Sequence, residues 1–198
     1  MNLCFLGDAL DHWKGSLFEL LQRSDLLCDF AVDPLASDLK SWQTENFEVF
    51  ARLLRVEQHQ IVFHHASLDN REEYFREIRH KGDLFLDPDT GVATGRVKEK
   101  SQYVTPEEVR LLLNQSDRML AVYQHVRAKA TSERVNEVGL CLQQAISNLH
   151  WVSYESANVA MIFFSHSTPR LGQVAGALRK FLGSAASRRV RICKCEAH

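Results

Sequence analysis

Short apolar runs alternate along this chain with amphipathic segments. Apolar runs bounded by turn residues are typical of buried strands, and apolar residues that recur at three- and four-residue spacing are typical of helices. The pattern predicts strands at residues 26–32, 60–64, 84–86, 119–123, 151–154 and 159–164. It predicts helices at residues 11–23, 42–56, 69–80, 105–115, 131–149 and 169–183.

Strands that alternate with helices predict an α/β fold, a Rossmann-like three-layer sandwich whose mostly parallel sheet is covered on both faces. Only residues 155–158 separate the last two strands, which predicts a late antiparallel hairpin. The chain contains no internal repeat, so we expect a single domain over residues 1–198. Residues 188–193 form either a last edge strand or part of a basic tail over about 184–198, for which disorder is one alternative.

Two of the expected strands stop at an Asp-Pro pair, Asp33-Pro34 and Asp87-Pro88. Proline has no N–H to donate to a sheet ladder, so each strand must end there. Open α/β sheets bind ligands at the carboxyl ends of their strands. We therefore expect Asp33 and Asp87 to share one cleft, with a strand-ending turn that carries no chemistry as the alternative.

The catalytic candidates follow the strands at 84–86 and 119–123. Asp87 and Asp89 place two carboxylates at one strand end. His125 follows the next strand on the same sheet edge, and its free pKa near neutrality suits a general base. Lys14 beside Asp11 is expected to form a helix salt bridge rather than a catalytic pair. The full set of catalytic candidates is Asp87, Pro88, Asp89, Thr90 and His125.

Three short motifs carry a resemblance to a known family. Asp33-Pro34-Leu35-Ala36-Ser37-Asp38 and Asp87-Pro88-Asp89-Thr90 resemble the two Asp-Pro motifs of amino-methyltransferases that act on nucleic acid. The opening at residues 7–14 resembles the start of 23S rRNA adenine-N6 methyltransferases and three-Cys-motif partner proteins, in which an Asp-x-x-Lys helix precedes the first strand. The resemblance covers residues 7–125 and implies S-adenosylmethionine as cofactor and nucleic acid as substrate. It implies a cofactor site made by Lys14, Asp33, Pro34, Ser37, Asp38 and His64.

The chain departs from the family pattern at several positions. Ser37-Asp38 stands where the family has Gly-Ser-Gly, whose glycines permit a tight turn and a close approach to the ligand. Thr90 stands in place of the tyrosine that stacks on a flipped base. Only one helix–strand unit separates the two motifs, where the family has two. A non-catalytic partner protein on a methyltransferase fold is therefore a second hypothesis.

A metal-dependent nuclease is the alternative from a different chemistry. Such enzymes hold Mg²⁺ with Asp on one strand and Glu-x-Lys on the next. Asp87 or Asp89 followed by Glu99-Lys100 is superficially similar, but adjacent strand residues point to opposite faces. His64 and His65 near Asp69 are the other candidate ligands. No second cluster has ligand spacing, so we expect no metal site.

Charge and composition set the expected partners. The net charge is −1, but the basic excess falls late in the chain. No apolar run reaches the roughly 20 residues that a membrane helix needs, so no membrane partner is expected. The five cysteines are scattered and odd in number, which indicates reduced thiols in a cytoplasm. The basic cluster has two interpretations. It either contacts nucleic acid or forms a solvated helix face followed by a tail. Its residues are Arg179, Lys180, Arg188, Arg189, Arg191 and Lys194.

Overall fold

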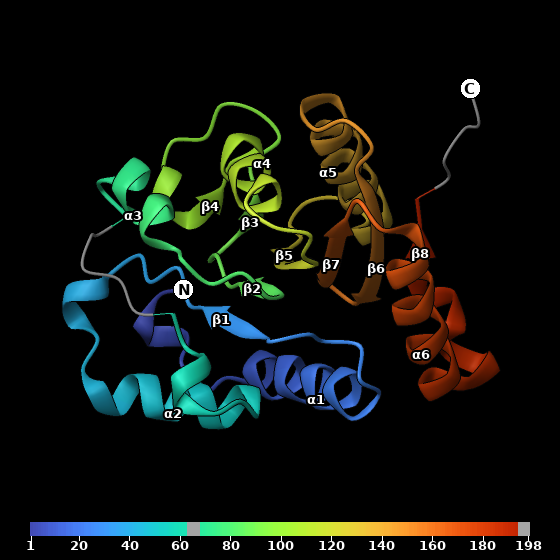
Figure 1. The fold of residues 1–198 in the computed structure, drawn as a ribbon, viewed down its shortest axis with the longest axis horizontal. Coiled ribbons are helices and arrows are strands. Elements are labelled where there is room, and N and C mark those ends of the chain that lie inside the picture. The colour runs from blue at the N-terminus through green and yellow to red at the C-terminus, as the bar shows by residue number, and fades with distance from the viewer. Residues whose placement is uncertain (63–67, 194–198) are drawn as a thin grey trace.

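The computed structural model describes residues 1–62 and 68–193, and its centre is a six-stranded mixed sheet (Figure 1). The strand order is β1-β2-β5-β7-β6-β8. β1, β2 and β5 pair in parallel, and β7 runs antiparallel between β5 and β6. The strands are β1 (Ala31–Asp33), β2 (Leu84–Leu86), β5 (Leu120–His125), β6 (His150–Ser156), β7 (Val159–Ser165) and β8 (Val190–Ile192).

Helices cover both faces of this sheet, which confirms the prediction of a Rossmann-like three-layer α/β fold. α1, α2 and α6 pack on one face, and α3, α4 and α5 pack on the other. Side chains alternate along each strand, so Phe85 joins the first cluster while its neighbours Leu84 and Leu86 join the second. The helices are α1 (Ala9–Arg23), α2 (Thr44–Leu54), α3 (Arg71–Glu77), α4 (Pro106–Asn114), α5 (Thr131–Ala145) and α6 (Thr168–Ala186).

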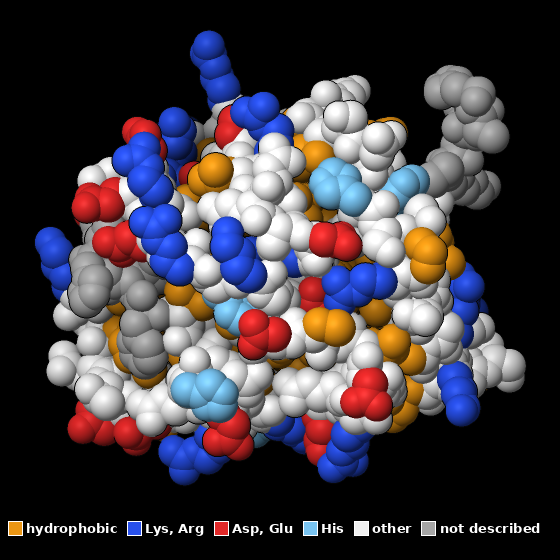
Figure 2. Space-filling model, viewed as in Figure 1, with side chains coloured by type: hydrophobic (Ala, Val, Ile, Leu, Met, Phe, Trp, Pro, Cys, Tyr) orange, Lys and Arg blue, Asp and Glu red, His pale blue; other side chains and the backbone are white. Residues whose placement is uncertain are grey.

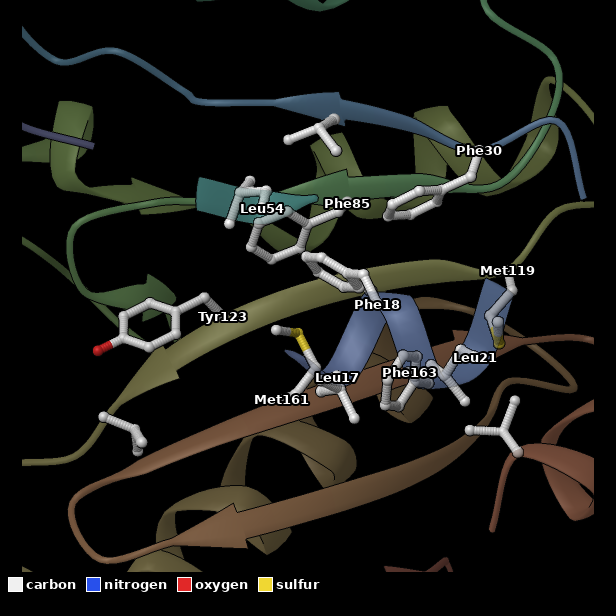
Figure 3. Packing of buried hydrophobic residues seen from close by; sticks show 14 of the residues in the cluster. Leu17, Phe18, Leu21, Phe30, Leu54, Phe85, Met119, Tyr123, Met161 and Phe163 are labelled. Atoms are coloured by element: carbon white, nitrogen blue, oxygen red, sulfur yellow. The ribbon is translucent and has the colours of Figure 1, made fainter. Parts of the chain in front are cut away.

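Three aromatic side chains pack between α1 and the sheet in the core on the α1 face. Figure 3 shows Phe18 of α1 directed at the sheet, where its ring centroid lies 4.8 Å from that of Phe85. Phe30, which precedes β1, packs on the other side of Phe18 at 5.0 Å. All three side chains are buried. Burial of such large apolar side chains is the main favourable term in folding, and here it fixes α1 against the centre of the sheet.

Several boundaries differ from the expected ones. The first strand begins at Ala31 rather than at residue 26, because Asp25 and Asp29 adopt positive φ angles of 53° and 45° and break the extended path. Of the strand expected at 60–64, Ile61 forms an isolated parallel bridge with Val32, and residues 63–64 lie outside the described residues. Of the two alternatives for residues 188–193, the structure shows the edge strand β8, which pairs with β6.

The stretch after β2 contains two short strands. β3 (Gly91–Val92) and β4 (Tyr103–Val104) pair in parallel as a separate small sheet. Gly91 has φ +126°, and a Cβ there would lie 2.3 Å from the side-chain oxygen of Gln124. That amide group accepts a hydrogen bond from Val92 N and donates to Thr90 O. Glycine is therefore required at this position, and Gln124 ties the segment after β2 to β5.

Five short 3-10 helices connect these elements among the described residues. The first, η1, precedes α1, and the others lie in connections between the longer elements. Their bounds are η1 (Leu3–Phe5), η2 (Leu39–Ser41), η3 (Gln58–Gln60), η4 (Lys100–Gln102) and η5 (Ser187–Arg189).

Candidate functional site

A cavity of about 350 Å³ opens at the carboxyl ends of β2 and β5. Its volume is at the lower end of the range of small-molecule sites. The walls come from η1, the start of α1, the segment after β2 and the end of β5. All five catalytic candidates from the sequence line it: Asp87, Pro88, Asp89, Thr90 and His125.

The two strand-end aspartates are neighbours, as the parallel pairing of β1 with β2 requires. Asp33 lies opposite Leu86 in the register, and Asp87 N donates to Asp33 O at 3.0 Å. Asp87 lines the cavity, whereas Asp33 does not. The Asp33 carboxylate is fully buried and accepts hydrogen bonds from Leu35 N at 2.8 Å and from the Tyr74 hydroxyl at 2.7 Å. Asp33 thus shapes the turn after β1, and Asp87 faces the space.

Lys14 joins the helix α1 to the end of β2. Its ammonium donates to Asp11 Oδ1 at 3.0 Å and to Asp87 Oδ2 at 2.8 Å. The expected helix salt bridge is therefore present, with Asp87 as an additional partner. The same ammonium lies 4.6 Å from the centroid of the Tyr123 ring, within cation–π distance. Asp11 and Lys14 are three residues apart on a helix, so they share one face and both reach the cavity floor.

Lys14 is charged in this site. Burial opposes the charge, but Asp87 and Asp11 outweigh that effect and raise the pKa of Lys14 above its usual value. Burial also raises the pKa of Asp87, and the ammonium of Lys14 acts against that shift. Because the ammonium faces two carboxylates at hydrogen-bond distance, we assign the pair the ionised state. The exposed fractions are 4% for Lys14 and 1% for Asp87.

Tyr123 and His125 form the wall at the end of β5. Burial raises the pKa of Tyr123, and Asp87 adds to that shift, so the phenol keeps its proton. Burial lowers the pKa of His125, and the positive charge of Arg127 lowers it further. His125 is therefore a neutral imidazole near pH 7, a state in which one ring nitrogen can accept a proton.

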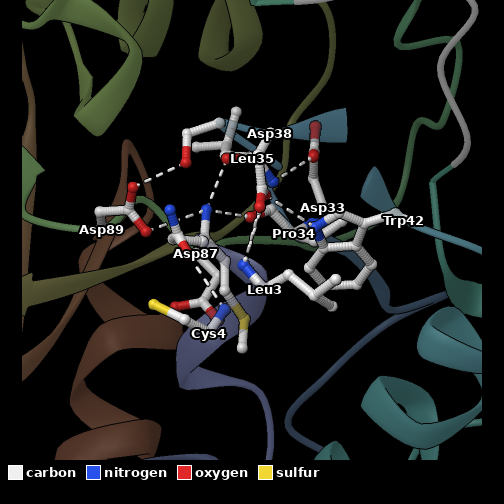
Figure 4. Close-up of polar contacts among 12 residues, drawn as sticks. Leu3, Cys4, Asp33, Pro34, Leu35, Asp38, Trp42, Asp87 and Asp89 are labelled. Carbon is white, nitrogen blue, oxygen red and sulfur yellow. Dashed lines mark hydrogen bonds and ion pairs between the residues drawn. The ribbon is translucent and has the colours of Figure 1, made fainter. Parts of the chain in front are cut away.

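The loop after β1 is covered by the first residues of the chain (Figure 4). The Met1 amino group donates to Pro34 O at 2.7 Å and to Leu35 O at 2.5 Å. Met1 O in turn accepts a hydrogen bond from Ser37 N at 3.1 Å. Leu3 N donates to the Asp38 carboxylate at 3.3 Å. Three backbone groups of this loop, Pro34 O, Leu35 O and Ser37 N, are thus bonded to Met1.

The polar side chains of the same loop are also engaged. Ser37 Oγ donates to Asp89 Oδ2 at 2.8 Å, and Trp42 Nε1 donates to Asp38 Oδ1 at 3.1 Å. Leu35 has φ +42°, an unusual angle for a non-glycine residue, and no glycine lies between Pro34 and Asp38. Several polar groups of the loop that the resemblance assigns to S-adenosylmethionine are therefore bonded within the chain.

The remaining cofactor-site candidates divide into three groups. Lys14 lines the cavity, as expected. His64 lies outside the described residues, as do His65, Lys194, Cys195 and His198. None of the candidates from the loop after β1 lines the cavity: Asp33, Pro34, Ser37 and Asp38.

The nuclease pattern is not assembled. Glu99 immediately precedes η4, and Lys100 begins it, so the two residues do not lie on a strand beside Asp87. Within the described ranges, 1–62 and 68–193, no group of three or more His, Cys, Asp or Glu side chains is placed to hold a metal ion. Lys14 already occupies one oxygen of Asp87.

The late basic cluster lies on α6, η5 and β8, away from the cavity lining. Arg179 donates to Val190 O, and Arg189 donates to Glu155 O. Arg191 donates to Ser132 O and to Asn136 Oδ1. Figure 2 shows many Lys and Arg side chains over α3 and β4 instead, with acidic side chains among them. Ion pairs of Arg71 with Glu108 and of Arg76 with Glu72 account for part of that mixture.

Sequence reasoning missed several residues of the cavity lining. Phe5, Asp8, Leu10 and Gln102 line it, and none of them lies at the end of a predicted strand. Tyr123 could have been found, because it closes the apolar run at 119–123, two residues before His125. Phe5, Asp8 and Leu10 reach the cavity through the path of η1 and the start of α1, and Gln102 reaches it from η4; no local pattern specifies either path.

Comparison with known proteins assigns this chain to no family. Among the described residues, no helix combines the length and the apolar composition needed to cross a bilayer. No known family model matches this sequence, and no curated protein matches it either.

Proposed function

We propose that this chain is a methyltransferase-like binding protein whose cavity at Asp87 takes a planar ligand with an amino group, a nucleobase being the favoured class. The antiparallel β7 between β5 and β6 supports this proposal, because a late hairpin is the ending typical of methyltransferase-type folds. The Asp11–Lys14 helix turn beside Asp87 supports it as well.

The charges of the cavity favour an amine over an anion. Carboxylates accept hydrogen bonds only, and each oxygen has more than one lone pair. Asp87 therefore keeps acceptor capacity after Lys14 has donated to Oδ2. A phosphate would meet the acidic excess and be repelled. The charged side chains of the described lining are Asp8, Asp11, Asp87 and Asp89 against Lys14 and Arg127.

We propose binding without methyl transfer for the chain as arranged. The buried Lys14–Asp87 pair lines an open cavity, while Met1 and Leu3 bond to the loop after β1, which the resemblance would make the S-adenosylmethionine site. This contrast is the observation that carries the proposal. It favours the partner-protein hypothesis over an active methyltransferase and over a nuclease. A cytoplasmic location is proposed on the cysteines, since Cys4, Cys28, Cys141 and Cys193 are free thiols.

Calorimetric titration with adenosine, and with S-adenosylmethionine in parallel, tests this proposal. We expect saturable heat with adenosine and none with S-adenosylmethionine at millimolar concentration. Asp87→Asn should weaken adenosine binding about 10- to 100-fold, because it removes the charge that the amino group contacts. Asp117→Asn, the same change at an exposed aspartate outside the cavity lining, is the matched control and should bind as the wild type does.

Two outcomes would contradict the proposal. Absence of saturable heat with adenosine would show that the cavity is not a nucleobase site. Tight binding of S-adenosylmethionine to the wild type would show that residues 1–3 do not block the donor, and it would favour an active methyltransferase.

A further inference from the structure

We propose that Phe5 is the stacking surface of this site: its ring lies against the flat face of the bound base while the base's amino group reaches Asp87. This inference rests on the proposed function and adds the residue that selects a planar ligand. In the family pattern, the stacking aromatic residue stands where this chain has Thr90. Phe5 supplies an aromatic ring to the same cavity from a different part of the chain.

The 3-10 turn η1 directs Phe5 away from the core. Its neighbours Leu3 and Leu6 pack against the hydrophobic cluster under α1. Phe5 is 56% exposed and lines the cavity. An exposed phenylalanine alone needs no explanation, but this ring borders a cavity whose floor carries hydrogen-bond acceptors. The other large exposed apolar side chains of the described residues lie outside that lining: Leu111, Leu140, Phe181 and Ile192.

The backbone around Phe5 is fixed on both sides. Before it, the Asn2 side chain accepts a hydrogen bond from Cys4 N at 2.9 Å. After it, Asp8 N donates to Phe5 O at 3.2 Å, and Asp8 caps the start of α1. Since α1 also carries Lys14, the ring and the Lys14–Asp87 pair belong to one connected frame. The backbone that carries the ring is therefore held in place relative to Asp87 before a ligand binds, which limits the backbone entropy lost on binding.

Ring face and carboxylate together define the ligand. An aromatic ring stacks on any flat π system and contributes little binding free energy to an aliphatic amine. A carboxylate accepts a hydrogen bond from an N–H group and has no donor for a carbonyl oxygen. A ligand that satisfies both is a heteroaromatic ring with an exocyclic amino group, such as adenine or cytosine. Phe5 then determines that the ligand is planar, and Asp87 determines that it carries an amine.

Substitution at Phe5 tests this assignment with adenosine as the probe. Phe5→Leu keeps an apolar side chain but removes the ring face, so adenosine should bind about 5- to 100-fold more weakly. Phe5→Tyr keeps the ring face and should bind within about twofold of the wild type. Phe181→Leu makes the same change at an exposed phenylalanine on α6 and should leave the affinity unchanged. Phe5 is largely exposed, so all variants should fold, which circular dichroism would verify.

The outcomes separate this inference from the proposed function. Equal adenosine affinity for the wild type and Phe5→Leu, with binding still lost in Asp87→Asn, would overturn the role of Phe5 alone. Equal weakening by Phe5→Leu and Phe5→Tyr would also overturn it, because a loss that the ring cannot rescue is not stacking. Absence of adenosine binding to every variant, the wild type included, would overturn both.

Discussion

The ammonium of Lys14 lies 2.8 Å from a carboxylate oxygen of Asp87, although 73 residues separate them along the chain. The contact joins the first turns of α1 to the end of β2, and both side chains are buried. A buried ion pair is costly to desolvate and still more costly to leave half-made. The site therefore depends on both partners being present.

Replacement of Lys14 by methionine should destabilise the protein by about 3–5 kcal/mol, because it leaves Asp11 and Asp87 as buried carboxylates without their cation. Urea unfolding would measure this loss. Lys14→Met combined with Asp87→Asn should cost less than the sum of the two single changes, since the second removes one unpaired charge.

The control for Lys14→Met is Lys81→Met. Lys81 is exposed, and its ammonium donates to Gln115 O at 3.3 Å. This change should alter the free energy of unfolding by less than about 0.5 kcal/mol. A cost for Lys14→Met as small as that of the control would mean that the ion pair does not hold α1 to β2.

Tyr74→Phe should lower stability and flatten its dependence on alkaline pH. Burial raises the pKa of Tyr74 well above 10.0, and Asp33, to which the hydroxyl donates, raises it further. The folded state thus holds this proton more tightly than the unfolded state, so its contribution is full below pH 10 and is lost as the pH rises above that value.

The free energy of unfolding, measured from pH 8 to pH 11, checks this prediction. Tyr74→Phe should cost about 1–3 kcal/mol near neutral pH, because Asp33 loses a buried donor, and the decline above pH 10 should be shallower than in the wild type. The slope will not vanish, since Tyr123 and Lys14 also have raised pKa values. An unchanged slope would mean that the folded state does not raise the pKa of Tyr74.

Gly15 is required for the contact between α1 and α2. A Cβ at this position would lie 2.1 Å from the backbone oxygen of Leu53, so the two helices would have to separate. Gly15→Ala should destabilise by about 1–3 kcal/mol. Gly176→Ala is the matched control, because Gly176 lies within α6 with no atom within 4 Å of the new methyl group. It should stabilise by about 0.5–1 kcal/mol through helix propensity, and thermal unfolding of both variants should show opposite signs.

The strand ends were predictable because their signals are local. A Leu- and Phe-rich run followed by Asp-Pro stops a strand whatever surrounds it, and the α/β alternation then fixes which edge Asp87 occupies. It was not predictable from the sequence that Asp87 lines the cavity whereas Asp33 does not. This difference depends on Tyr74 and Lys14, which reach the two carboxylates from distant helices. The deep burial of Asp87, whose exposed fraction is 1%, has the same cause.

The sequence pattern did not indicate that Met1 and Leu3 cover the loop after β1. Met1 and Leu3 bond to Pro34, Leu35 and Asp38 through backbone groups, which every residue type has. The motif resemblance could therefore point to this loop as a cofactor site but could not show that Met1 and Leu3 bond to it. The position of Phe5 depends on the same segment, so it too required the folded structure.

Recognition of an amino group by Asp87 is tested most directly by comparing two ligands on the unchanged protein. Because Asp87 is buried and paired with Lys14, its substitution also affects folding, whereas a change in the ligand does not. Adenosine and purine riboside differ in the exocyclic amino group, so calorimetric titration of both isolates the contact with Asp87. If Asp87 accepts a hydrogen bond from the amino group, purine riboside should bind about 10- to 100-fold more weakly than adenosine. Equal affinities would contradict the claim that the carboxylate of Asp87 recognises an amino group.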